Sequence, residues 1–146
     1  MQLTVYGQSL IFNGECERGI EILEKAFELD PMNQELVDKI IWGYYAMADY
    51  EACIYHANKI KKMGPNNWLL KIASLGALMR YEERDTEMNL FTGAHGKDEL
   101  KLQFDNLNFN NEEIVESTKR FIFNELESGN VVFNESKFQN FAIQNN

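Results

Sequence analysis

The chain is poor in the residues that usually mark catalysis, metal binding or secretion. Its 146 residues include two cysteines, two histidines and two prolines, and 14 basic residues stand against 23 acidic ones. Cys16 and Cys53 lack metal-ligand spacing, so we expect buried reduced thiols rather than a disulfide, a metal site or a nucleophile. The net charge of −9 repels phosphate backbones and anionic lipid, which argues against nucleic-acid and membrane-surface partners.

Long apolar runs and targeting patterns are missing as well. No stretch approaches the roughly 20 apolar residues that cross a bilayer, and no basic start followed by an apolar run marks a secretory signal. We therefore expect a cytoplasmic protein. One basic cluster, Lys59, Lys61 and Lys62, stands at the end of an expected helix, where cations stabilise the C-terminal partial charge.

Catalytic motifs are equally scarce. The chain has no Gly-rich phosphate loop, no HExxH, no paired-cysteine motif and no nucleophile elbow. His56 and His95 are far apart in the sequence, and the many carboxylates follow the solvated faces of expected helices. We expect no enzymatic activity, no cofactor and no bound metal.

The chain does contain an internal period. Pro31 and Pro65 stand 34 residues apart and close two segments that can be laid over each other. A period of 34 residues is the length of a helix–turn–helix repeat. The small or apolar positions of the first segment are Gly7, Leu10, Gly19, Leu23 and Ala26, and the same offsets in the second are Ile41, Tyr44, Cys53, Ala57 and Ile60.

These residues resemble the tetratricopeptide repeat. The resemblance implies an all-α fold, an α-solenoid of helix–turn–helix repeats closed by C-terminal capping helices. The expected units are repeats at 1–33 and 34–67, a partial repeat at 68–96, capping helices at 97–129 and a polar tail at 130–146.

The repeats predict particular helix boundaries. In the first, helices at 1–13 and 15–30 flank a turn at Gly14, and Pro31 stops the second helix because the residue before a proline avoids the α region. In the second, Asp49 is expected to cap a helix that Gly64 and Pro65 end. The partial repeat is expected to contain a clean apolar helix at 68–80 and a degenerate helix that residues 93–96 break early.

The C-terminal part predicts fewer elements. A short helix is expected at 98–104, and a longer one, capped by Asn110 or Asn111, contains Leu126 and ends near Ser128. The tail at 130–146, which carries Phe133, Phe138, Phe141 and Ile143, either docks as a final helix or is disordered.

In proteins that the repeats resemble, the first helices of successive repeats line a concave groove. Such a groove suits an extended or helical peptide with apolar anchors. Packing between repeats is the alternative role for Trp42 and Tyr45. Carried over by the resemblance, the peptide-binding groove comprises Gln8, Ile11, Asp38, Trp42, Tyr45, Leu69, Ile72 and Met79, with Thr4, Glu35 and Gly76 on the same faces.

Some members of this family grip the C-terminal carboxylate of heat-shock chaperones with lysine, asparagine and arginine. The comparable positions here contain one cation among five, which argues against a chaperone-adaptor role. Those positions are Thr4, Gln8, Lys39, Leu69 and Ala73.

The expected function is therefore a protein–protein interaction module that binds a peptide segment of a partner. Two alternatives remain open: the C-terminal regulatory repeat region of a larger bacterial signalling protein, either a transcriptional regulator or a cyclase, and a small secretion-type chaperone. The first helix begins next to Met1 without a capping helix before it. Its flank is thus expected to be covered by preceding sequence, by a partner, or by a second copy in a homo-oligomer.

Overall fold

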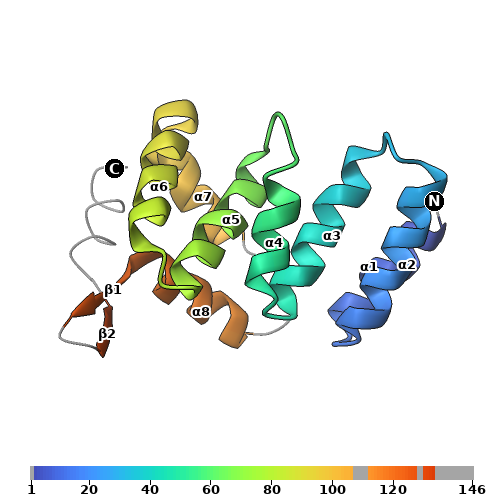
Figure 1. Ribbon diagram of the computed structural model, residues 1–146, viewed down its shortest axis with the longest axis horizontal. Coiled ribbons are helices and arrows are strands. Elements are labelled where there is room, and N and C mark those ends of the chain that lie inside the picture. Colours follow the sequence, from blue (N-terminus) through green and yellow to red (C-terminus); the bar gives the residue numbers. More distant parts are fainter. Residues whose placement is uncertain (1, 107–111, 128–129, 134–146) are drawn as a thin grey trace. The chain divides into compact units, whose positions relative to one another are not determined.

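The computed structural model describes residues 2–106, 112–127 and 130–133. These residues form eight α-helices and one antiparallel β-hairpin (Figure 1). The chain divides into two compact units, residues 1–62 and residues 63–146. The predominantly helical fold confirms the expected class, with the hairpin as a departure from it. The first unit contains α1 (Gln2–Phe12), α2 (Cys16–Leu29), α3 (Gln34–Ala46) and α4 (Tyr50–Ala57).

The second unit contains the remaining elements. Helices α5 (Pro65–Ala77) and α6 (Tyr81–His95) form a helical hairpin, and α7 (Lys97–Asp105) contacts both of them. Helix α8 (Glu112–Phe123) contacts α5 and leads directly into strand β1 (Asn124–Glu127), which pairs with β2 (Asn130–Phe133). Within the described ranges, no helix combines the length and apolarity that crossing a bilayer requires.

The same turn joins the two helices of all three hairpins. Its central residue, Gly14, Ala48 or Met79, has a positive φ of 88°, 62° or 60°. The next backbone N–H donates to the carbonyl five residues earlier, which is the hydrogen bond of a Schellman motif. These bonds run from Glu15 to Leu10 at 2.8 Å, from Asp49 to Tyr44 at 2.9 Å and from Arg80 to Leu75 at 2.9 Å.

The turns correct the expected register of the third hairpin. Gly14 and Ala48 are 34 residues apart (48 − 14), but Ala48 and Met79 are only 31 apart (79 − 48). Helix α4 ends early, at Ala57, and Pro65 opens α5 with Gly64 as its N-cap. The prediction that Pro65 closes a helix is therefore wrong. A proline suits the first position of a helix as well as the position after its end, so the residue type alone did not distinguish the two.

In the first unit, α1, α2, α3 and the start of α4 lie where the sequence predicts them. Pro31 follows the end of α2, and the Asp49 carboxylate caps α4 by accepting a hydrogen bond from the N–H of Ala52 at 3.2 Å. Helices α1 and α2 approach closely at Gly19, because this residue has no side chain. A Cβ there would lie 2.7 Å from the carbonyl oxygen of Gly7. The buried core contains Ile11, Ile20, Leu23, Ala26, Leu36 and Ile40.

Helix α6 ends within the expected segment 93–96, at His95 with Gly96 as its C-cap. It runs through Gly93 because one glycine costs a helix only about 1 kcal/mol and Met88 and Phe91 are buried. The expected end of α8 is wrong. Helix α8 ends at Phe123 instead of continuing to Leu126, and the strand-favouring residues Val131 to Phe133 pair with 124–126 instead. The predicted short helix at 98–104 is confirmed as α7. Asn110, Asn111 and residues 134–146 lie outside the described residues.

Candidate functional site

The common turn gives one frame for the first helix of each hairpin. We define the groove face of α1, α3 and α5 as the positions ten, six and three residues before the turn residue. This frame depends only on the turn in each hairpin, so it applies within either unit. The equivalent sets are Thr4, Gln8 and Ile11 on α1, Asp38, Trp42 and Tyr45 on α3, and Leu69, Ala73 and Gly76 on α5.

In the first unit, Trp42 is the aromatic residue of the groove face that keeps partial exposure. Its ring packs on that of Phe12 from α1, with centroids 4.8 Å apart and an angle of 59° between the planes. Tyr45 is buried and meets Tyr50 edge-on at 5.7 Å, and Ile11 is buried in the core. Trp42 is thus held in place by an aromatic neighbour but is not enclosed.

Polar groups of α1 and α3 lie next to this aromatic pair. The Lys39 ammonium donates a hydrogen bond to Gln8 Oε1 at 2.8 Å and lies 3.6 Å from the Glu35 carboxylate. Gln34 Nε2 lies 3.5 Å from Asp38 Oδ1. Gln8, Asp38 and Lys39 are all partly exposed, so the face offers both donors and acceptors beside an aromatic surface.

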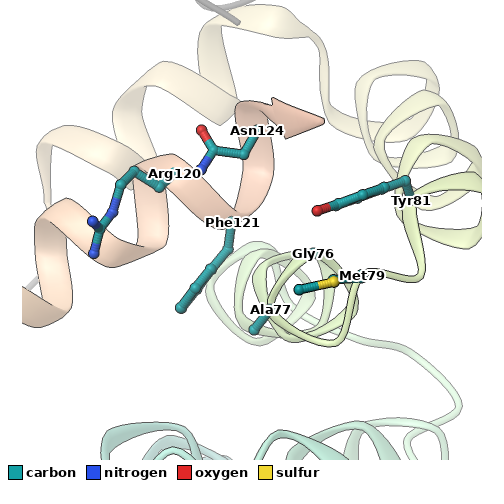
Figure 2. A pocket seen from close by; sticks show the side chains of 7 residues that line it. All are labelled: Gly76, Ala77, Met79, Tyr81, Arg120, Phe121 and Asn124. Carbon is teal, nitrogen blue, oxygen red and sulfur yellow. The ribbon is translucent and has the colours of Figure 1, made fainter. Parts of the chain in front are cut away.

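In the second unit the groove face is covered. Leu69 and Ala73 have no exposed surface, and Gly76 is buried as well. Helix α8 lies against this face: a Cβ added at Gly76 would collide with the carbonyl oxygen of Phe121 (Figure 2). The face that α3 presents with Trp42 is, on α5, an internal contact of the unit.

Two expected groove residues change their place because of the three-residue shift. Met79, which is 57% exposed, lies in the turn after α5 and not on the groove face of a helix. Ile72 is fully buried and corresponds to Ile41, the core position seven residues before the turn. The sequence register, fixed by Pro65, placed both residues one helical turn away from their positions.

Sequence reasoning missed Arg84. It lies five residues after the turn, where the other hairpins have Gly19 and Cys53, and it is fully buried. Its Nη1 donates to the carbonyl oxygens of Phe121, at 3.1 Å, and Asn124, and its Nε donates to the Asp85 carboxylate at 3.0 Å. A large cation at a small-residue position was the signal, but it becomes visible only in the corrected register.

A cavity of about 480 Å³ lies where the α5–α6 turn meets the junction of α8 and β1 (Figure 2). In Figure 2, Phe121 extends from α8 toward Ala77, and Tyr81 reaches from α6 toward the same space, while the Arg120 side chain points away from it. The lining is therefore mostly apolar. It comprises Gly76, Ala77, Met79, Tyr81, Arg120, Phe121 and Asn124.

Several buried polar atoms of the second unit have no partner in the described part of the chain, and one of them belongs to a residue that lines this cavity. Asn124 Oδ1 is buried at its wall, and Arg84 Nη2 is buried behind the carbonyls that Nη1 holds. Ser74 Oγ, on α5, is a third such atom. Buried polar groups in native proteins are nearly always hydrogen-bonded. Each of these three atoms could therefore still form a hydrogen bond.

A second polar cluster lies on the other side of α3. The Tyr44 hydroxyl donates to Glu24 at 2.9 Å, and burial, together with this bond, raises the pKa of Tyr44 to about 12. The His56 ring stacks on Tyr44 with centroids 5.1 Å apart, and burial and then the nearby Lys59 lower the pKa of His56. Both effects favour uncharged rings at neutral pH, which is an arrangement for packing.

Comparison with known proteins gives no relative: no protein-family model, no curated protein and no solved structure matches the chain. Among the residues with described placement, no group of three His, Cys, Asp or Glu side chains is arranged to hold a metal ion.

Proposed function

We propose that this chain is a tetratricopeptide-like interaction module that binds a peptide segment of a partner protein through the groove face of its first helices. The recurrence of one Schellman turn in three helical hairpins supports the repeat assignment. The observation that carries the binding proposal is Trp42, half-buried on Phe12 and flanked by the polar groups of Gln8, Asp38 and Lys39.

The chemistry of this face suits a peptide. Tryptophan is among the residues that contribute most to binding energy at interfaces, and polar groups around such an anchor pair with the backbone and side chains of the ligand. The Gln8 and Lys39 side chains are already held by one another, so little conformational entropy is lost when they meet a ligand.

Charge narrows the class of peptide. The face carries Glu35 and Asp38 against Lys39, and the whole chain has a net charge of −9. Both favour a ligand that combines an apolar anchor with lysine or arginine, since opposite charges steer association and reject acidic competitors.

A displayed peptide library tests the proposal. Selection on the full chain should enrich peptides with an apolar anchor next to a basic residue, and binding of a selected, fluorescently labelled peptide is then followed by anisotropy. Loss of a central aromatic anchor typically costs about 2 kcal/mol or more, so Trp42→Ala should weaken binding roughly 30-fold.

Tyr55→Ala is the matched control, because Tyr55 is an exposed aromatic residue of α4 in the same unit. It should bind the selected peptides as the parent does, and circular dichroism should show the same helical signal for both variants. Failure to enrich any peptide, or equal affinity of Trp42→Ala and the parent, would contradict the proposal.

A further inference from the structure

One helix of the chain lies on the face of α5 that corresponds to the partly exposed Trp42 face of α3. Helix α8 covers the groove face of α5 at Gly76 and buries its own Thr118, Ile122 and Phe123. On the side of α8 opposite Thr118 and Ile122, Glu112, Glu113 and Glu116 are exposed. Helix α8 is thus an amphipathic helix seated with its apolar side inward.

Besides α6, two helices of the second unit pack against α5, namely α7 and α8. A terminal cap of a helical repeat covers its exposed core and has a polar outer face. Helix α7 covers part of the third hairpin, because it contacts both α5 and α6. Helix α8 covers a different part of the hairpin, where it packs on the groove face of α5 and accepts a hydrogen bond from Arg84 of α6.

Arg84 gives this contact its directionality. The guanidinium reaches through the space beside Gly76, where its Cδ would lie 3.2 Å from an added Cβ, and holds the carbonyls of Phe121 and Asn124 at the C-terminal end of α8. The C-terminal end of a helix carries a partial negative charge, so the buried cation selects this end of a helix and would repel an N-terminal end.

The fit between α8 and its seat is incomplete. A cavity of about 480 Å³ remains between the α5–α6 turn and the end of α8. Asn124 Oδ1 at its wall is buried without a partner in the described part of the chain, and Arg84 Nη2 and Ser74 Oγ in the same unit are buried without one as well. A ligand that filled the cavity and reached the Asn124 amide would make contacts that α8 does not make.

We propose that α8 is an exchangeable internal ligand, and that the groove face of α5 beneath it binds an amphipathic helix of a partner protein. Such a helix presents its C-terminal carbonyls to Arg84, a small or β-branched residue and an aliphatic residue four positions apart to α5, as Thr118 and Ile122 are spaced on α8, and an aromatic side chain to the cavity. This inference rests on the proposed function for the groove face but assigns the partner class from α8 itself.

The test is a competition between α8 in the chain and α8 added in trans. The probe is a fluorescent peptide with the sequence of residues 112–127, titrated into the full chain and followed by anisotropy. Ile122 is fully buried on α8, so Ile122→Ser loosens the internal helix and leaves α5 unchanged. Because apparent affinity falls by the fraction of open sites, Ile122→Ser should bind the peptide at least about tenfold more tightly than the parent.

Two further variants make the result specific. Adding Gly76→Ala to Ile122→Ser should remove the gain, since the new Cβ occupies the position of the Phe121 carbonyl in the bound helix. Leu90→Ser, an exposed residue of α6, makes a similar change of polarity outside the site and should bind the peptide as the parent does. Equal peptide affinity of Ile122→Ser and the parent, or a gain that Gly76→Ala leaves intact, would overturn the inference.

Hydrogen exchange of the unaltered chain gives a test without a variant. Amides of α8 should exchange through an opening that leaves α5 and α6 protected. If α8 amides exchange only together with those of α5, the inference is overturned. This result does not depend on whether the Ile122→Ser variant folds. The Trp42→Ala experiment is independent of the α8 experiments. If Trp42→Ala binds the selected peptides as the parent does but Ile122→Ser binds the α8 peptide more tightly, only the Trp42 anchor is rejected. If Trp42→Ala weakens binding but Ile122→Ser does not tighten it, only the exchange of α8 is rejected.

Discussion

Helices α3 and α5 begin hairpins with the same turn, but their equivalent faces differ in side-chain size. Trp42 on α3 corresponds to Ala73 on α5, and Tyr45 corresponds to Gly76. Large side chains occupy this face of α3, whereas the small ones on α5 allow α8 to approach until its carbonyl oxygen meets Gly76. The difference teaches that the same face of a helical hairpin can keep a partly exposed aromatic residue or be covered by the chain itself, according to the size of two residues.

A second pair of positions shows the same contrast. Gly19 lies five residues after the first turn and Arg84 five residues after the third. At Gly19 a Cβ would meet the backbone of α1, so the position must stay small. The Arg84 side chain extends past Gly76 and bonds the carbonyl of Phe121 at the end of α8. A large residue therefore fits at this position because α8 provides its hydrogen-bond partner.

The largest expected effect is on the free energy of unfolding, when the cation beside each face, Arg84 or Lys39, is replaced by methionine. Arg84→Met keeps the bulk but removes the donors to the Phe121 and Asn124 carbonyls, and it should lower the free energy of unfolding by about 3 kcal/mol. Lys39→Met removes an ammonium that stays partly solvated beside Gln8 and Glu35, and it should cost about 1 kcal/mol or less. Urea unfolding followed by circular dichroism measures both values, and equal losses would show that the two faces do not differ as described.

The next effect compares two helical glycines of the second unit. Gly76→Ala places a Cβ against the Phe121 carbonyl, so α8 must shift, and overpacking of this kind costs about 1–3 kcal/mol. Gly93→Ala meets open space in α6 and should stabilise the protein by about 1 kcal/mol through helix propensity. Thermal unfolding should therefore show shifts of opposite sign. A stabilising Gly76→Ala would mean that α8 does not lie on this face.

The smallest effect concerns the opposite side of α3, which is a packing surface in the first unit. Burial and Lys59 lower the pKa of His56, while Glu24 and Asp49 oppose that shift. The unfolded chain therefore binds the proton more readily than the folded chain, so the free energy of unfolding should fall as the pH drops below about 6.5. His56→Asn should reduce the loss seen between pH 7.5 and 5.5, and an unchanged pH dependence would contradict this packing role.

The first unit was predictable because its local signals agree with each other. Pro31 and Asp49 mark the end of α2 and the start of α4 as expected, and the apolar positions lie at helical spacing. The helical class, the hairpin turn at Gly14 and the short helix α7 follow from the same signals.

The second unit was less predictable because its key features depend on contacts distant in sequence. Pro65 fits either end of a helix, and its position shifted the expected register by three residues, which misplaced Ile72 and Met79. The end of α8 at Phe123 depends on Arg84, 37 residues before Phe121 along the chain, and on pairing with β2. Trp42 and Gln8 in the first unit were assigned to one face by the resemblance, and both are partly exposed on their helices, while their role in binding stays a prediction.

The central claim is that α8 covers the groove face of α5, while Trp42 on the equivalent face of α3 keeps partial exposure. Nuclear Overhauser effects measure this directly in the full chain. Contacts are expected between the α protons of Gly76 and protons of Phe121 and its neighbours in α8, and between the rings of Trp42 and Phe12, with the Trp42 indole quenched readily by acrylamide in a Trp68→Phe background. Intact α5 and α8 helices without contacts at Gly76, or a Trp42 that acrylamide does not reach, would contradict the account.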